Sequence, residues 1–484
     1  MAGIGFALRT LSRQETLSSV VKASGHAAVI AAGPWLFTIF SLAAITTSSE
    51  PLAGNDTLAT FRAVIIYAFA TSLVLASPVA IVATRLLADH LWRRETQHVR
   101  PLLVAALALA IAAVFLGVVA LVAYFDVPLR LALSLYATTA IVAMIWIAVA
   151  FCGAVKDYAG VTLGFVVGLL VSIAASTAAA LSGLGAPGMV WGFCIGLAVT
   201  LFALTLRILA TFPAALRKPW SEMPALLRGF GPYVYLAAGA LFGTAGVWID
   251  KWVFWFSQEG QSVTGGLIHA PLYDSAMFLA SLVLIPALAQ FVLKLETDFF
   301  DHYQQYYGTI QAHGTIDQID RSRERLQANS FESLALITAA QIAIAAVLVL
   351  AAPAIIEILN LQFRQIAILR YGALGSVFQF VFIAATSMIV FFDRRAHYCA
   401  LQLLFFVLNF SLTVLTISWG EDYYGVGYFL AAFISSAVAI VVADRTFARL
   451  NYLTFIGNNP SIYGARRTLR ERFARHFGGI QRKA

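Results

Sequence analysis

The stretch LLVAALALAIAAVFLGVVALVAYF occupies residues 102–125 and carries no charged side chain. As a helix it is long enough to cross the hydrocarbon core of a bilayer, which takes about 20 residues. Apolar runs of similar length recur along the whole chain, and only short charged stretches separate them. The sequence therefore predicts an all-α polytopic membrane protein.

The composition excludes most soluble classes of protein. The chain has 484 residues, of which 60% are hydrophobic and 12% are charged, whereas soluble domains carry about 25% charged residues. This excludes an ordinary soluble enzyme, a secreted disulfide scaffold and a nucleic-acid-binding domain, although the net charge is +8. The three cysteines lie in or beside apolar runs at spacings that suit neither a metal site nor disulfides, so we expect them to pack in the core.

A hydropathy window of about 19 residues predicts twelve membrane-spanning helices, which we expect in two lobes of six. The predicted spans are 24–47, 61–84, 102–125, 129–151, 159–182, 187–211, 231–250, 266–293, 333–356, 371–392, 397–419 and 424–444.

Basic residues set the expected orientation, because Lys and Arg resist translocation across the membrane. With the N-terminus in the cytoplasm, about 27 of the 32 Lys and Arg residues lie on the cytoplasmic side. The five on the opposite side are Arg62, Arg130, Lys251, Arg364 and Arg370. This asymmetry predicts cytoplasmic N- and C-termini. We therefore expect the excess of Lys and Arg mainly to set the orientation of the chain in the membrane, and secondarily to attract the anionic lipid bilayer.

The predicted spans and the charged segments divide the chain into five parts. These are a cytoplasmic amphipathic N-terminus (1–23), an N-lobe of six spans (24–211), a cytoplasmic linker (212–230), a C-lobe of six spans (231–444) and a basic cytoplasmic tail (445–484).

The two sets of six spans share a short repeat. Residues 73–78, LVLASP, match residues 282–286, LVLIP, and a basic and then an acidic residue follow each proline. Six is an even number, so both lobes begin on the same side of the membrane, and paired lobes of this kind enclose a central cavity in transporters. We expect Pro34, Pro78 and Pro286 to bend their helices, because an interior proline frees a backbone carbonyl. A kink that serves packing alone is the alternative.

Few ionisable side chains lie within the predicted spans, where each costs at least about 2.5 kcal/mol at mid-span. Asp274 stands about nine residues into the span 266–293, roughly 12 Å deep, and Asp250 and Lys251 close the seventh span. We expect these three as polar groups of a substrate pathway, with Asp274 as the best candidate for an acid that faces the cavity. For Asp274, a structural ion pair or hydrogen bond between helices is the alternative.

Four side chains around Asp250 share one helical face by their i, i+3, i+4, i+7 spacing. They are Trp248, Lys251, Trp252 and Trp255. An aromatic belt with a snorkelling lysine is the ordinary explanation. The functional interpretation is a platform of aromatic faces, joined by Tyr273, that stacks on the apolar faces of sugar rings.

A long polar segment, 294–332, interrupts the C-lobe, and we expect it to be helical with a break near His313 and Gly314. Aromatic side chains on an otherwise charged segment need something to cover them, so we expect a cytoplasmic partner to dock there. A solvated connector is the alternative. The expected docking residues are Phe299, Phe300, Tyr303, Tyr306, Tyr307, Arg321, Arg323 and Arg325.

No constellation for catalysis emerges from the sequence. It contains no Walker motif and no glycine motif for dinucleotides, and no acid, histidine and serine share a predicted face. We therefore expect a protein that is not an enzyme and that holds no cofactor and no metal.

Residues 2–9, AGIGFALR, and residues 32–36, AGPWL, resemble the start of the PelG family of exopolysaccharide transporters. The family pattern has Glu at the position of Ala7, so any role of that acid is not carried over. The resemblance implies a bacterial inner-membrane exporter with the two-lobed fold of the multidrug, oligosaccharidyl-lipid and polysaccharide superfamily, of MATE or Wzx type.

The resemblance further implies export of the Pel polysaccharide, an N-acetylgalactosamine-rich, partly deacetylated polymer of the biofilm matrix, toward the periplasm. The implied partners are the polysaccharide chain, a cytoplasmic glycosyltransferase like PelF, and inner-membrane proteins like PelD and PelE. Two alternatives stay open. A cation-coupled efflux carrier for small molecules shares the architecture, and a membrane-embedded glycosyltransferase is disfavoured by the short outer loops.

Overall fold

A computed structural model of the chain describes residues 37, 40–155, 158–216, 218–263 and 265–457. In this part of the chain, ten helices are long and apolar enough to cross a membrane, and the bent pair Met223–Gly229 and Val234–Trp255 raises the number to eleven. The prediction of an all-α polytopic membrane fold is confirmed.

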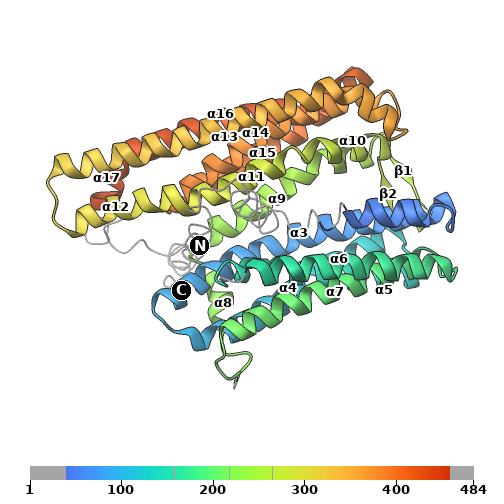
Figure 1. Cartoon of the computed structure of the whole chain (residues 1–484), viewed down its shortest axis with the longest axis horizontal. Helices are drawn as coiled ribbons and strands as arrows, with labels where there is room; N and C mark the ends of the chain where they lie inside the picture. Colours follow the sequence, from blue (N-terminus) through green and yellow to red (C-terminus); the bar gives the residue numbers. More distant parts are fainter. Residues whose placement is uncertain (1–36, 38–39, 156–157, 217, 264, 458–484) are drawn as a thin grey trace, which may run out of the picture.

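The first group of helices is coloured blue to green in Figure 1. Its members are α3 (Asn55–Trp92), α4 (Val99–Phe125), α5 (Leu129–Cys152), α6 (Tyr158–Leu181), α7 (Gly185–Thr211) and the short α8 (Met223–Gly229). Small residues let α6 and α7 pack backbone to backbone. A Cβ added at Gly196 of α7 would lie only 2.4 Å from the carbonyl oxygen of Gly168 in α6.

The second group runs from α9 to α17, which a π-helical turn (Leu453–Gly457) follows. Its members are α9 (Val234–Trp255), α10 (Pro271–Ser281), α11 (Leu284–Lys294), α12 (Phe300–Gln311), α13 (Ile316–Ile358), α14 (Gln365–Phe391), α15 (Arg395–Trp419), α16 (Val426–Ala448) and α17 (Leu450–Tyr452). An antiparallel hairpin, β1 (Gln261–Ser262) and β2 (Ile268–His269), connects α9 to α10.

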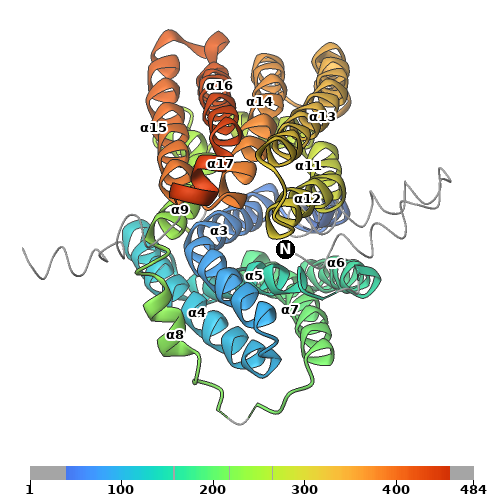
Figure 2. The same ribbon diagram turned by 90° about the vertical axis from the view of Figure 1, so that its left-hand side faces the viewer.

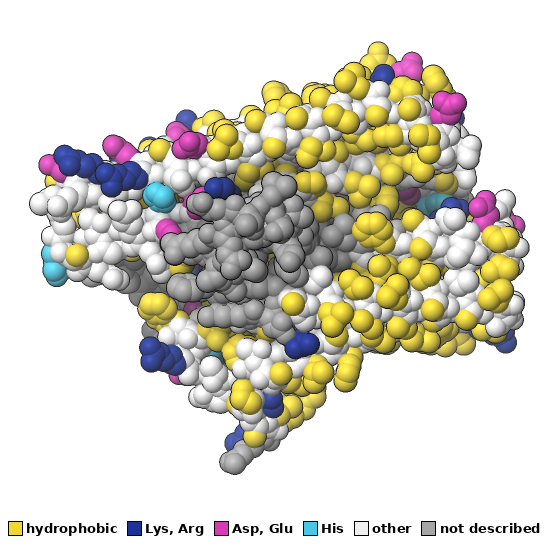
Figure 3. All heavy atoms as spheres, viewed as in Figure 1, with side chains coloured by type: hydrophobic (Ala, Val, Ile, Leu, Met, Phe, Trp, Pro, Cys, Tyr) yellow, Lys and Arg dark blue, Asp and Glu magenta, His cyan; other side chains and the backbone are white. Residues whose placement is uncertain are grey.

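The two groups lie against each other along the length of the molecule (Figures 1 and 2). The β1–β2 hairpin is at one end, on the right of Figure 1, and α8, α12 and α17 are at the other. We call these the hairpin end and the basic end, because the Lys and Arg side chains visible in Figure 3 gather mainly at the left.

Eleven of the twelve predicted spans correspond to helices of the described structure. The remaining one, 24–47, lies outside the described residues except for 37 and 40–47, and residues 40–49 are helical. Pro34, the N-terminal segment 1–23 and the tail beyond residue 457 also lie outside the described residues. The five-part division of the chain stays a prediction.

The helix that carries Asp274 starts later than we expected. The predicted span began at residue 266, but residues 261–269 form the hairpin, in which Gln261 pairs with His269 and Ser262 with Ile268. Helix α10 begins at Pro271, whose fixed φ and missing N–H suit the first turn of a helix. Asp274 is therefore in the first turn, and the expected depth of nine residues is wrong.

Helix α9 ends later than we expected, at Trp255 instead of residue 250. Asp250 and Lys251 therefore lie inside the helix and do not close it. A charged pair usually marks the end of a span, but here Asp250 is fully buried in the protein, so the helix continues past it.

The two groups meet where α3 runs antiparallel to α9. At the hairpin end, the rings of Tyr67 and Trp255 stack with centroids 4.5 Å apart. At mid-length the hydroxyls of Ser77 and Thr244 are 3.0 Å apart. Near the basic end, the Tyr233 hydroxyl, just before α9, donates to Asp89 at 3.4 Å. This junction positions the candidate site.

Candidate functional site

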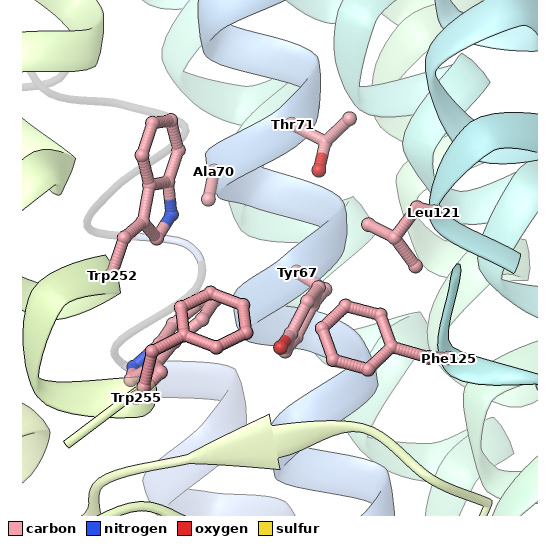
Figure 4. Close-up of a pocket in the computed structure, with 8 residues that line it drawn as sticks. Tyr67, Ala70, Thr71, Leu121, Phe125, Trp252 and Trp255 are labelled. Atoms are coloured by element: carbon pink, nitrogen blue, oxygen red, sulfur yellow. The ribbon is translucent and has the colours of Figure 1, made fainter.

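A pocket of about 170 Å³ lies in the junction between the two groups, near the hairpin end. Helices α3 and α4 form one wall and the last turn of α9 forms the other (Figure 4). Five of the lining side chains are aromatic. The lining residues are Tyr67, Ala70, Thr71, Leu121, Phe125, Trp252, Trp255 and Phe256.

Two of the four residues that we placed on one face of α9 line this pocket. Trp252 and Trp255 are three positions apart, so both project from the same side of the helix toward α3. Trp248 and Lys251 do not line the pocket, and the Lys251 ammonium is 5.8 Å from the centroid of the Trp248 ring. The structure therefore brings together only part of the predicted aromatic platform.

Asp274 lies directly behind the pocket wall. Its Oδ2 accepts a hydrogen bond from the Trp255 indole N–H at 2.9 Å and another from the Ala270 backbone N–H at 3.1 Å. Its Oδ1 is buried and has no hydrogen-bond partner. Asp274 holds a pocket residue in place, and the wall residue Trp255 stands between it and the Tyr67 ring.

Asp250, Lys251 and Tyr273 form a separate network, in which Asp250 and Tyr273 are buried and Lys251 is partly exposed. Asp250 is completely buried, accepts a hydrogen bond from the Tyr273 hydroxyl at 2.9 Å and lies 3.2 Å from the Lys251 ammonium. Tyr273 is also completely buried and stacks on Phe254, with ring centroids 3.7 Å apart. Neither Asp250 nor Tyr273 lines the pocket, and a buried charge needs such partners because desolvation is costly. The role of these three residues in a substrate pathway stays a prediction.

Of the three prolines that we expected to bend their helices, Pro78 and Pro286 lie in the described residues, and their effects differ. Pro78 lies inside the continuous α3, where the Ser77 hydroxyl donates to the Val74 carbonyl at 3.1 Å and so satisfies the group that Pro78 leaves without its usual donor. Pro286 cannot donate to Leu282, and the helix is interrupted at residues 282–283, between α10 and α11. A break is therefore seen only at Pro286.

The aromatic residues of the segment 294–332 pack mostly inside the protein. Phe299 and Tyr306 are buried; Phe299 packs edge-on against Phe391, and the Tyr306 hydroxyl donates to Asn451 Oδ1 at 2.9 Å. Burial raises the pKa of Tyr303 to about 12. Our premise that a partner must cover these rings is wrong for Phe299 and Tyr306, because α14 and the segment after α16 cover them.

The other predicted docking residues are more accessible. Phe300, Tyr303 and Tyr307 are half-buried, Arg321 and Arg325 are exposed, and Arg323 pairs with Asp320 at 3.3 Å. The expected break is confirmed: residues 312–315 are not helical, and His313 has a φ of 57°. After it, Thr315 and Gln318 cap the start of α13 with reciprocal hydrogen bonds.

Sequence reasoning missed the pocket residues of the first group, which include Tyr67, Thr71 and Phe125. Each looks like an ordinary residue of an apolar span, and only the pairing of α3 with α9 gives them a common site. Among the described residues, no group of three His, Cys, Asp or Glu side chains could hold a metal ion.

The fold is similar to solved transporters. One is described as the inward-facing conformation of a multidrug resistance MATE family transporter of the MOP superfamily (TM-score 0.62, 13% identity, 88% of this chain and 99% of that chain). Another is the outward-facing conformation of such a transporter (TM-score 0.59, 15% identity, 88% and 96%). A third is MATE in complex with MaL6 (TM-score 0.61, 14% identity, 88% and 97%).

The sequence was also compared with protein families and with curated proteins. Residues 1–455 match the model of the family described as PelG, putative exopolysaccharide exporter (EPS-E). Among curated proteins, none matches the sequence.

Proposed function

The chain belongs to the PelG family of putative exopolysaccharide exporters, and from this membership we propose that it exports the Pel polysaccharide, an N-acetylgalactosamine-rich polymer, across the bacterial inner membrane. The family and the fold point to a membrane transporter and not to an enzyme. The polymer would pass between the two groups of helices, from a cytoplasmic glycosyltransferase to the periplasm.

The observation that carries this proposal is the aromatic pocket at the junction of α3 and α9. Five aromatic rings face a space of about 170 Å³, and its polar side chains are few. Aromatic faces attract the apolar faces of sugar rings without binding them through many fixed hydrogen bonds. A site of this kind suits a polymer that must move along its path.

The proposed orientation of the protein in the membrane follows from the distribution of its positive charges. Lys and Arg are retained on the cytoplasmic side of membrane proteins, and they gather mainly at the basic end (Figure 3). We therefore place the basic end in the cytoplasm and the hairpin end in the periplasm, and we keep the prediction that both termini of the chain are cytoplasmic. The polymer would enter at the basic end.

The pair of helices α12 and α13 is the proposed contact for the glycosyltransferase. It projects at the basic end (Figure 1), and its outward residues include Arg321 and Arg325. A PelF-like enzyme bound there would deliver the growing chain to the junction. PelD-like and PelE-like membrane proteins would complete the assembly.

A pair of tryptophan variants tests the proposed pathway. Trp252→Ala removes one pocket wall, and Trp191→Ala removes an indole of equal size from the exposed surface of α7. We expect Trp252→Ala to lower polymer secretion at least tenfold at normal abundance in the membrane, and Trp191→Ala to leave it unchanged. Wild-type secretion by Trp252→Ala would refute the pathway.

A cation-coupled efflux carrier for small molecules is the second candidate, because the solved neighbours include multidrug transporters and the pocket volume is that of a small molecule. Such a carrier confers drug resistance on a host that lacks the polysaccharide synthase. An export subunit does not, so drug susceptibility in that host separates the two. Sugar transfer by the purified protein alone would instead indicate a membrane glycosyltransferase.

A further inference from the structure

We propose that the β1–β2 hairpin is the gate of the transport path at the hairpin end, that Tyr67 holds it shut, and that Asp274 couples it to the pocket as a positioning residue. This inference rests on the proposed transport function but not on the identity of the polymer. It assigns one task to three features that lie next to each other: the hairpin, the aromatic pocket and the unpaired carboxylate oxygen.

Tyr67 contacts the hairpin and the pocket at once. Its hydroxyl, on α3 of the first group, donates to the carbonyl oxygen of Ile268 in β2 at 2.7 Å. Its ring stacks on Trp255 with centroids 4.5 Å apart and meets Phe125 edge-on at 5.7 Å. One buried side chain therefore ties the hairpin of the second group to the first group and also forms a wall of the pocket.

The tip of the hairpin fits closely against the first group. Gly265 and Gly266 have φ values of 110° and 82°, which favour glycine. A Cβ at Gly266 would lie 2.3 Å from the carbonyl oxygen of Phe125, and one at Gly265 would lie 2.7 Å from the Leu131 side chain. The hairpin is thus seated on the α4–α5 turn and bridges the two groups at this end of the junction.

Asp274 connects the pocket wall to the base of the hairpin. The same oxygen, Oδ2, accepts from the Trp255 indole and from the backbone N–H of Ala270, the residue that follows β2. A movement of the Trp255 ring therefore disturbs the bond that fixes the hairpin base. The free Oδ1 leaves a second acceptor available when these donors shift.

These contacts give the order of events. A sugar ring that enters between Tyr67 and Trp255 separates their stacked rings. The displaced Tyr67 can no longer reach Ile268, and the displaced Trp255 no longer shares Asp274 with Ala270. Both attachments of the hairpin weaken together, so the hairpin end of the junction opens only when the pocket is occupied.

Distances between nitroxide labels across the hairpin end test the gate. The labels are attached to Leu129→Cys of α5 and Trp419→Cys of α15, both at exposed positions, in a chain whose three native cysteines are replaced by alanine. Tyr67→Phe keeps the ring and removes only the hydroxyl, and Tyr136→Phe of α5 is the matched control. We expect Tyr67→Phe to raise the ratio of open to closed molecules about fivefold, as the loss of one hydrogen bond predicts, and Tyr136→Phe to leave it unchanged.

Two substitutions of Asp274 separate positioning from charge. Asp274→Ala loses both bonds and should open the gate at least as much as Tyr67→Phe. Asp274→Asn keeps an oxygen that accepts from Trp255 and Ala270, so it should restore the closed distribution. Equal opening in Asp274→Asn and Asp274→Ala would overturn the positioning role.

The gate and the proposed function fail in different ways. Unchanged label distances in both Tyr67→Phe and Asp274→Ala would overturn the gate, whatever the secretion assay gives. Normal secretion by Trp252→Ala would refute the polymer pathway, while a shifted distance distribution in Tyr67→Phe would still support a gate in a transporter of another substrate.

Discussion

The hydroxyls of Ser77 on α3 and Thr244 on α9 lie 3.0 Å apart at the midpoint of the junction between the two groups of helices. The contact with Trp255 at Tyr67 is ten residues away along α3, and the contact with Tyr233 at Asp89 is twelve residues away. If one group rocks against the other, as in many transporters, this midpoint moves least. We therefore expect this pair to be the fulcrum of the junction.

A disulfide at the fulcrum should be tolerated. Ser77→Cys with Thr244→Cys places two sulfurs close enough for a bond of about 2.0 Å, and we expect the oxidised protein to secrete polymer within twofold of its reduced form. A short bifunctional thiol reagent joining Tyr124→Cys to Phe256→Cys, at the hairpin end, should block the secretion that the same double variant retains without the reagent, because those rings belong to different groups. Equal loss of secretion from both cross-links would contradict a fulcrum.

Acid pH should open the hairpin end. Burial, and then the positive charge of Arg62, lower the pKa of His269 in β2. The closed state disfavours protonated His269, so the stability of the closed state is full above the ordinary pKa of about 6.5. It falls as the pH drops below that value, until the lowered pKa is reached.

The nitroxide distances at pH 7.5 and 5.5 measure this effect. His269→Gln should abolish the pH response, and His313→Gln, at the exposed turn of the basic end, should retain it. The same response in the wild type and in His269→Gln would contradict the prediction.

The spans were predictable because hydrophobic length alone decides whether a helix can cross a bilayer. Residues 102–125, for example, end at Phe125, the last residue of α4. The end of α9 was missed because the charge of Asp250 looks like a boundary in sequence. It is instead buried against Tyr273, which lies in another helix.

The candidate site was only partly predictable. The spacing of Trp252 and Trp255 placed them on one face of α9, and they do line the pocket. Tyr67 stacks on Trp255 across 188 positions of sequence, and one sequence carries no local signal for such a pair. Phe299 shows the converse error, because aromatic spacing looks the same whether the cover comes from a partner or from the chain's own α14.

Stability and partner binding should separate within the segment 294–332. Phe299→Ala removes a buried ring and should lower the free energy of unfolding by about 3–5 kcal/mol, with reduced abundance in the membrane. Reversing the charge of the exposed Arg321 and Arg325 to Glu should leave abundance unchanged and should lower co-purification of the cytoplasmic glycosyltransferase at least fivefold. Undiminished co-purification in the double variant would exclude these arginines from the contact.

Glu222 should hold the linker between the two groups in place. One carboxylate oxygen lies 2.6 Å from His98 Nδ1 and the other lies 3.4 Å from His90 Nε2, at the turn between α3 and α4. Hydrogen bonds to charged groups contribute about 1.5–3 kcal/mol, so Glu222→Gln should speed limited proteolysis within 212–230 about tenfold. Glu324→Gln, at an exposed position, is the control, and equal cleavage rates would contradict this role.

Helix α13 runs unbroken from Ile316 to Ile358, which makes it about 65 Å long at 1.5 Å per residue. A bilayer core takes up about 30 Å of this length, so roughly half of the helix lies outside the lipid. This half and the membrane-embedded half form one continuous rod. Such a rod is a lever arm. A tilt of about 10° within the membrane would move its free end by about 6 Å. A protein bound to this end would therefore sense the conformational state of the transporter.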